Sequence, residues 1–182
     1  MTKTPPRDIA DTEKTLEPGL YIVASPIGNL QDLTLRAARI LCEADVVACE
    51  DSRVTAKLLR AAGSTRPMTI FHEHSRPQVL EKLLARAACE AVALVSDAGT
   101  PLVSDPGFEL VRAARALGVR VTTAPGPSAV ITALSISGLP TDRFMFAGFL
   151  PAKAVARDQA LLGLARIQAT LVFYEAPSRL PA

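Results

Sequence analysis

The chain has 182 residues, of which 49% are hydrophobic, and a formal net charge of +2 at pH 7. This composition supplies ample material for a core and excludes a disordered chain. No apolar run reaches the roughly 18 to 20 residues of a membrane span, and residues 1–18 lack the apolar block of a signal peptide, so we expect a cytoplasmic protein without a membrane partner. The charge is too small to indicate a nucleic-acid partner, although most of the 20 basic residues are Arg, which suits phosphate contacts.

Apolar β-type runs alternate with helical patterns after residues 1–18, which we expect to be a flexible arm. The strands are expected at 20–24, 46–49, 68–71, 92–95 and 119–123. The helices are expected at 33–44, 54–62, 77–88, 108–117 and 129–137. This order, with continuously apolar strands, predicts an α/β fold: an open, mostly parallel five-stranded sheet with helices on both faces. We assign residues 19–139 to this N-terminal domain.

Residues 140–182 have the pattern of a second, partial C-terminal α/β domain. Strands are expected at 143–149 and 170–174, on either side of a helix at about 154–166. About 40 residues are too few to bury a good core alone, so we expect this unit to be the start of a larger domain.

Residues typical of helix ends agree with these boundaries. Gly63 and Gly118 lie where left-handed helix ends are expected, Ser52 can cap the second helix, and Pro77 suits a first helical turn. The three cysteines (Cys42, Cys49, Cys89) are an odd number without metal-ligand spacing. We therefore predict free buried thiols and no metal.

Each of the first five strands is followed by a polar or Gly/Pro-rich loop. In an open parallel sheet such loops lie at one edge, where ligands bind, so we expect them to line one cleft. The longest loop is Ser96–Gly107, with the sequence SDAGTPLVSDPG. Neither the dinucleotide fingerprint nor the P-loop motif is present, which favours a nucleoside-like ligand bound mainly through backbone groups. Asp97 and Asp105 either cap this loop and the next helix or contact the ligand, and both roles are compatible.

Several segments together resemble the tetrapyrrole-methylase superfamily. They are Tyr21–Leu30 (YIVASPIGNL), Glu50–Arg53 (EDSR), 93–107, 125–129 (PGPSA), 148–151 (GFLP) and 173–175 (FYE). Within the superfamily they are most similar to the branch that methylates the ribose 2′-oxygen of a cytidine in bacterial small-subunit ribosomal RNA. The resemblance covers residues 19 to about 180. It implies S-adenosylmethionine bound in a cleft between two α/β domains, ribosomal RNA of the small subunit as partner, and a homodimer.

The resemblance also assigns roles to residues. Those that resemble cofactor-contacting motifs are Ser25, Pro26, Gly28, Asn29, Asp97, Ala98, Gly99, Thr100, Val103, Ser128, Ala129 and Leu150. A carboxylate or a neutral imidazole could take the proton of the ribose hydroxyl. The candidates at strand ends are Glu50, Asp51, His72 and Glu175. For phosphate contacts we consider Arg53, Lys153 and Arg157, although Glu50, Asp51 and Arg53 could instead form an ion-pair network within their loop.

Two other functions remain open. One is a tetrapyrrole (porphyrin or corrin) C-methyltransferase, which requires a broad apolar trough. The other is a nucleotide-binding regulatory module without catalysis. An RNA substrate requires a positive rim around the cleft and binding that weakens steeply with salt.

Overall fold

The computed structural model describes residues 16–180. Five parallel strands form the main sheet, in the order β3-β2-β4-β1-β5. They are β1 (Gly19–Val23), β2 (Val46–Cys49), β3 (Met68–Ile70), β4 (Ala91–Val95) and β5 (Val121–Ala124). β1, β2 and β4 are buried along their whole length, which explains their continuously apolar sequences. The predicted α/β class with an open parallel five-stranded sheet is confirmed.

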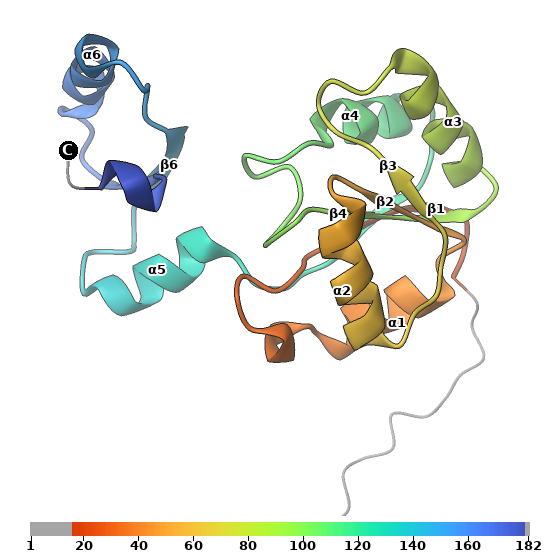
Figure 1. The fold of residues 1–182 in the computed structure, drawn as a ribbon. Coiled ribbons are helices and arrows are strands. Elements are labelled where there is room, and N and C mark those ends of the chain that lie inside the picture. The colour runs from red at the N-terminus through yellow and green to blue at the C-terminus, as the bar shows by residue number, and fades with distance from the viewer. Residues whose placement is uncertain (1–15, 181–182) are drawn as a thin grey trace, which may run out of the picture.

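Four helices cover the two faces of this sheet (Figure 1). They are α1 (Leu35–Glu43), α2 (Ser52–Ala62), α3 (Pro77–Ala87) and α4 (Phe108–Ala116). α1 and α2 share a core cluster with Tyr21 and Val23 of β1, whereas α3 and α4 share a second cluster with Leu20 and Ile22. Because successive side chains of a strand point to opposite faces, one central strand contributes to both cores.

The start of α2 differs from the prediction. Ser52 is the first residue of the helix, and the capping residue is Asp51, whose carboxylate accepts a 2.8 Å hydrogen bond from the main-chain N–H of Arg53. The prediction of Ser52 as the cap was wrong because the preceding carboxylate already satisfies a free N–H of the first turn. The left-handed Gly63 at the end of α2 (φ 74°) and Pro77 in the first turn of α3 are confirmed.

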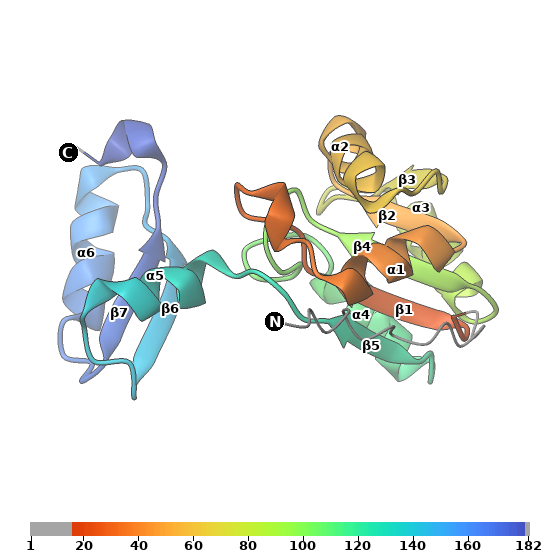
Figure 2. The ribbon, with the colours of Figure 1, turned by 90° about the horizontal axis from the view of Figure 1, so that it is seen from below.

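The chain then leaves the sheet and forms a second, smaller unit (Figure 2). The elements after β5 are α5 (Ala129–Ser137), β6 (Phe144–Phe149), α6 (Ala154–Leu164), β7 (Thr170–Tyr174) and the 3-10 turn η2 (Pro177–Arg179); a further 3-10 turn, η1 (Leu30–Asp32), precedes α1. β6 and β7 pair in parallel, and their register shifts between Phe146 and Phe149. α6 has no buried residue. The predicted boundary between residues 139 and 140 stays a prediction.

The segment before β1 and the three cysteines differ in part from what the sequence predicts. Residues 1–15 of the expected flexible arm lie outside the described part, whereas Leu16 packs against the core cluster of α1 and α2. All three cysteines are free, but only Cys49 is buried; Cys89 is exposed, so the prediction of buried thiols was wrong for it. Its place after the end of α3 explains the exposure.

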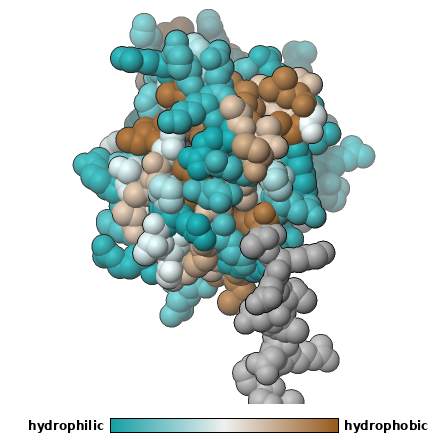
Figure 3. All heavy atoms as spheres, turned by 90° about the vertical axis from the view of Figure 1, so that its right-hand side faces the viewer, coloured by the Kyte–Doolittle hydropathy of each residue, from teal (hydrophilic) through white to brown (hydrophobic). Residues whose placement is uncertain are grey.

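The face that lies away from β6 and β7 is mostly hydrophilic, with separate apolar patches (Figure 3). No helix within residues 16–180 is both long and apolar enough to span a membrane.

Candidate active site

The loops after β1 and β4 are joined at the carboxyl edge of the sheet. The main-chain N–H of Ser25 donates to the carbonyl of Gly99 at 2.8 Å, and the N–H of Gly99 donates back at 3.1 Å. The buried Ser25 hydroxyl donates to the carbonyl of Ser96 at 3.1 Å. The structure therefore uses the Ser25 side chain to hold the two loops together.

The loop after β4 has an unusual backbone. Leu102 and Ser104 have positive φ angles of 74° and 64°, a conformation that costs a non-glycine residue roughly 1 to 3 kcal/mol. Gly107 ends the strained stretch, and a Cβ atom there would lie only 2.8 Å from a Leu94 methyl group. Such strain persists only where the surroundings determine the conformation, and it gathers at binding and catalytic sites.

A small hollow of about 250 Å³ opens beside this loop. Its lining combines three loops of the main sheet with two aromatic side chains of the second unit, Phe149 and Tyr174. The other lining residues are Ile27, Ala98, Gly99, Thr100, Val103, Ser104, Asp105, Ser128 and Ala129. The Thr100 hydroxyl donates to the carbonyl of Pro127 at 3.2 Å and so connects the loops after β4 and β5. Six of the residues expected to contact a cofactor thus share one hollow, although their role is still a prediction.

A larger hollow of about 800 Å³ lies at the ends of β2 and β3. Its lining contains five carboxylates, together with His72 and the rings of Phe71, Phe108 and Phe149. The acidic residues are Glu50, Glu73, Glu81, Asp105 and Glu109. Among the described residues, neither Lys nor Arg contributes to this lining. Glu109 is paired with Arg112, which lies outside the lining, so the excess negative charge of the larger hollow comes from the other four carboxylates.

Three residues line both hollows: Ser104, Asp105 and Phe149. The two spaces therefore meet at a shared wall made by the strained loop and the end of β6. The Phe149 ring also packs on Tyr174, with ring centroids 5.5 Å apart. The Tyr174 hydroxyl bonds to the main chain of Val130 at the start of α5. Aromatic contacts thus bring the second unit to the edge of the main sheet.

The acidic residues perturb one another's proton affinity. Burial is the main cause that raises the pKa of Glu50, with further increases from Asp97 and Asp105. Burial likewise raises the pKa of Asp105, a hydrogen bond with Ser96 opposes this increase, and Asp97 adds to it. Burial also raises the pKa of Tyr174, with a smaller contribution from Asp105. Perturbed carboxyl groups in a cleft are typical of functional sites.

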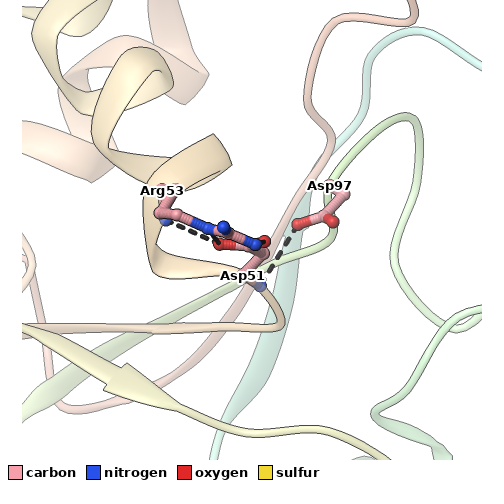
Figure 4. A network of polar contacts seen from close by, with 3 residues as sticks. All are labelled: Asp51, Arg53 and Asp97. Carbon is pink, nitrogen blue, oxygen red and sulfur yellow. Dashed lines mark hydrogen bonds and ion pairs between the residues drawn. The ribbon is translucent and has the colours of Figure 1, made fainter.

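The pKa of Asp51 is shifted in the opposite direction to that of its neighbour Glu50. Hydrogen bonds from the side chain and the main chain of Arg53 lower the pKa of Asp51 to about 2. The main-chain N–H of Asp51 donates to Asp97 Oδ1 at 3.3 Å, which links the ends of β2 and β4 (Figure 4). A carboxylate that is engaged by a guanidinium is a weak base, so Asp51 is better placed to hold this corner of the site than to accept a proton.

The remaining candidate residues lie outside the linings of both hollows. Asn29 accepts a hydrogen bond from Gln31 and caps η1. Glu175 pairs with Arg179 at 3.1 Å, and Arg179 also donates to the carbonyl of Leu150. The others are Ser25, Pro26, Gly28, Asp51, Arg53, Asp97, Leu150, Lys153 and Arg157. Within residues 16–180, no group of three or more His, Cys, Asp or Glu side chains is placed to hold a metal ion.

Sequence reasoning missed several lining residues. Glu81 and Glu109 belong to α3 and α4, where polar residues normally face solvent, so their residue type gave no signal. Glu73 lies in the loop after β3, which we expected to line the cleft. Tyr174 was part of a recognised segment, but only the pairing of β7 with β6 and the contact with α5 turn it toward the hollow.

Comparison with known proteins places the chain in one family. Residues 19–182 match the model of the Tetrapyrrole (Corrin/Porphyrin) Methylases, and the chain belongs to this family. Among solved structures, a uroporphyrin-III-C-methyltransferase from Thermus thermophilus is 27% identical, with a TM-score of 0.56 over 74% of this chain and 60% of that one. A diphthine synthase, 18% identical, shares the fold with a TM-score of 0.67, over 87% of this chain and 64% of that one.

Curated relatives are more similar in sequence. A protein of Mesorhizobium japonicum named Ribosomal RNA small subunit methyltransferase I is 54% identical over 92% of this chain and 57% of its own length. Proteins with the same name from Xylella fastidiosa and Pseudomonas aeruginosa are 55% and 51% identical, each over 88% of this chain and over 59% and 57% of their own lengths. The chain thus spans less than three fifths of the length of these curated relatives.

Proposed function

We propose that this protein is an S-adenosylmethionine-dependent methyltransferase that acts on the ribose 2′-hydroxyl of a cytidine in 16S ribosomal RNA, within the small subunit. The observation that carries this proposal is the pair of adjoining hollows at the carboxyl edge of the sheet, one small and one large. Methyl transfer requires a donor and an acceptor side by side, and two spaces that share a wall meet this requirement. The relatives named as small-subunit RNA methyltransferases support the choice of substrate.

The smaller hollow fits the methyl donor. Gly99 lets a ligand approach the main chain closely, and the apolar side chains of Val103 and Phe149 offer surfaces for an adenine ring. Asp105 lines the same space, and its carboxylate is complementary in charge to a sulfonium cation. When bound, S-adenosylmethionine supplies a methyl group on a positively charged sulfur. Holding donor and acceptor in line can supply roughly 7 to 11 kcal/mol of the barrier.

The larger hollow fits an uncharged nucleoside better than a phosphate. Its five carboxylates repel the anionic backbone, so the base and ribose would enter while the phosphates stay outside. Arg53, with 88% of its side chain exposed at the start of α2, is one candidate for those phosphates. Lys153 and Arg157, at the start of α6, are the others.

The resemblance to a uroporphyrin-III-C-methyltransferase makes a tetrapyrrole the second candidate substrate. The acidic lining argues against it, because a tetrapyrrole with carboxylate side chains would be repelled as strongly as a phosphate. The charge of the larger hollow therefore favours the nucleoside.

We also propose that two copies associate and that the protein works in the cytoplasm, where a ribosomal substrate is found. Apolar side chains of the second unit support association: Ile136 is 82% exposed and Leu162 73%. Sedimentation at several concentrations would test the dimer, and a monomer at all of them would contradict it.

Transfer of a labelled methyl group tests the function. The full chain is incubated with labelled S-adenosylmethionine and small ribosomal subunits that lack the modification, and the labelled nucleotide is then mapped. We expect label on the 2′-oxygen of a cytidine, and weaker binding as salt increases. Label in a porphyrinoid and none in RNA would overturn the proposal.

A further inference from the structure

The shared wall between the two hollows contains one ionisable side chain. Of the residues that line both spaces, Ser104, Asp105 and Phe149, only Asp105 can accept a proton near neutral pH. Glu50 and His72 line only the larger hollow. A base for methyl transfer must reach the hydroxyl at the point where the oxygen meets the methyl carbon, which lies at the junction of donor and acceptor.

We propose that Asp105 is the catalytic base that takes the proton of the acceptor hydroxyl. This inference rests on the proposed function. As the acceptor oxygen attacks the methyl carbon, the O–C bond forms and the C–S bond breaks, with its electron pair left on a neutral thioether sulfur. The hydroxyl proton passes to the carboxylate of Asp105 and afterwards to water, so charge and atoms balance.

The loop holds Asp105 in a fixed place. Ser104 before it has a φ of 64°, and Gly107 after it packs tightly against Leu94. The nearly buried Ser96 hydroxyl, just after β4, donates to the carbonyl of Ala98 at 3.3 Å and so holds the start of the same loop. A base that is already positioned loses little entropy when the acceptor binds.

The surroundings of Asp105 also suit a base. Asp97 of the same loop, Glu50 after β2 and Tyr174 of β7 are the ionisable groups that interact with it. Burial and the charge of Asp97 raise its pKa, which brings it nearer to neutral pH and makes the carboxylate a stronger base. At pH values above this raised pKa the carboxyl group is ionised and can accept a proton.

The test compares Asp105→Asn with wild type and with Asp158→Asn, an exposed residue of α6 that lies outside both hollows. We expect Asp105→Asn to lower kcat by about 10²- to 10⁴-fold and to remove the rise of activity with pH. KM for the subunits and calorimetric affinity for S-adenosylhomocysteine should stay within about twofold. Asp158→Asn should match wild type.

A second measurement does not depend on turnover. Carbon NMR of the ligand-free protein should find a carboxyl resonance that titrates above the ordinary range of Asp and is missing from Asp105→Asn. An Asp105 pKa within or below the ordinary range would overturn the assignment, as would an unchanged kcat or a loss confined to cofactor affinity. Wild type without activity on RNA would overturn the proposed function and this inference together, whereas an active wild type with an equally active variant would overturn this inference alone.

Discussion

Ser25 and Gly99 exchange two main-chain hydrogen bonds, of 2.8 and 3.1 Å, although they are 74 residues apart in the chain. The exchange continues the pairing of β1 with β4 by one antiparallel bridge beyond the sheet. It fixes the glycine-containing loop over the small hollow, so the position of that loop depends on the central strands. Substitutions at this edge should therefore affect ligand binding more than substitutions at other turns.

Gly99→Ala should weaken cofactor binding by about tenfold or more, since an overpacked site typically loses 1 to 3 kcal/mol. The new methyl group would lie 3.5 Å from the Ile27 side chain, inside the hollow. Gly63→Ala is the matched control because Gly63 has a similar φ of 74° with no atom within 4 Å of the added carbon. Both variants should lose about 1 to 2 kcal/mol of stability to backbone strain. Calorimetry with S-adenosylhomocysteine checks the difference, and equal affinities would remove Gly99 from the site.

Phe149→Ala should weaken cofactor affinity roughly fivefold, because an aromatic contact contributes about 1 kcal/mol beyond its buried area. Phe149 lines both hollows and packs on Tyr174. Phe144→Ala removes an exposed ring from the other end of β6, outside both linings, and should leave affinity unchanged. Fluorescence titration with a cofactor analogue measures both variants. Equal losses in the two would mean that β6 acts only through general stability.

Glu50→Gln should raise the melting temperature at pH 7 and have little effect near pH 4. The pKa of Glu50 is higher in the folded protein than in the unfolded chain, so folding takes up a proton between these two pKa values. As pH rises through this window, the Glu50 side chain lowers the free energy of unfolding. The amide does not titrate and avoids this loss. Thermal unfolding of both proteins from pH 4 to 8 tests the sign; a variant that is less stable than wild type at pH 7 would contradict it.

The same substitution should also alter catalysis. Removing the Glu50 charge relieves repulsion on Asp105, so the rise of activity with pH should move to lower pH. If Glu50 itself helped to activate the hydroxyl, turnover would fall more than cofactor affinity does. The pH profile of kcat and a calorimetric titration separate the two effects.

Asp51→Asn should reduce stability at neutral pH, with a difference from wild type that disappears in acid. The folded pKa of Asp51 is lowered to about 2 by Arg53. Its stabilising contribution is therefore complete above the ordinary value of 3.8 and is lost as pH falls toward 2. Urea unfolding of wild type and variant between pH 2 and 7 provides the measurement. A difference that is constant with pH would show that the ion pair with Arg53 contributes nothing to stability.

Most of the fold could be predicted from sequence because its signals are local. Uninterrupted apolar runs, such as Val46–Cys49, require a strand buried on both faces, and a glycine such as Gly63 ends a helix wherever the helix lies. The prediction of Ser52 as the cap is wrong because two adjacent residues are both suitable, and only the backbone geometry distinguishes them. Segment boundaries therefore shift by a residue or two while the order of elements holds.

Patterns within the chain establish an α/β protein whose strand-end loops are rich in glycine, proline and carboxylates, because these properties depend on residues a few positions apart. Which of these loops meet depends on the packing of the folded chain. The order β3-β2-β4-β1-β5 brings Ser25 to Gly99, and the return of β6 and β7 brings Phe149 to Asp105. Strand order and the packing of distant units depend on contacts between residues far apart in the chain, for which no local pattern provides a signal. The pairs of Asp51 with Arg53 and of Glu175 with Arg179 are local, two and four residues apart, so only side-chain geometry distinguishes these two carboxylates from Glu50.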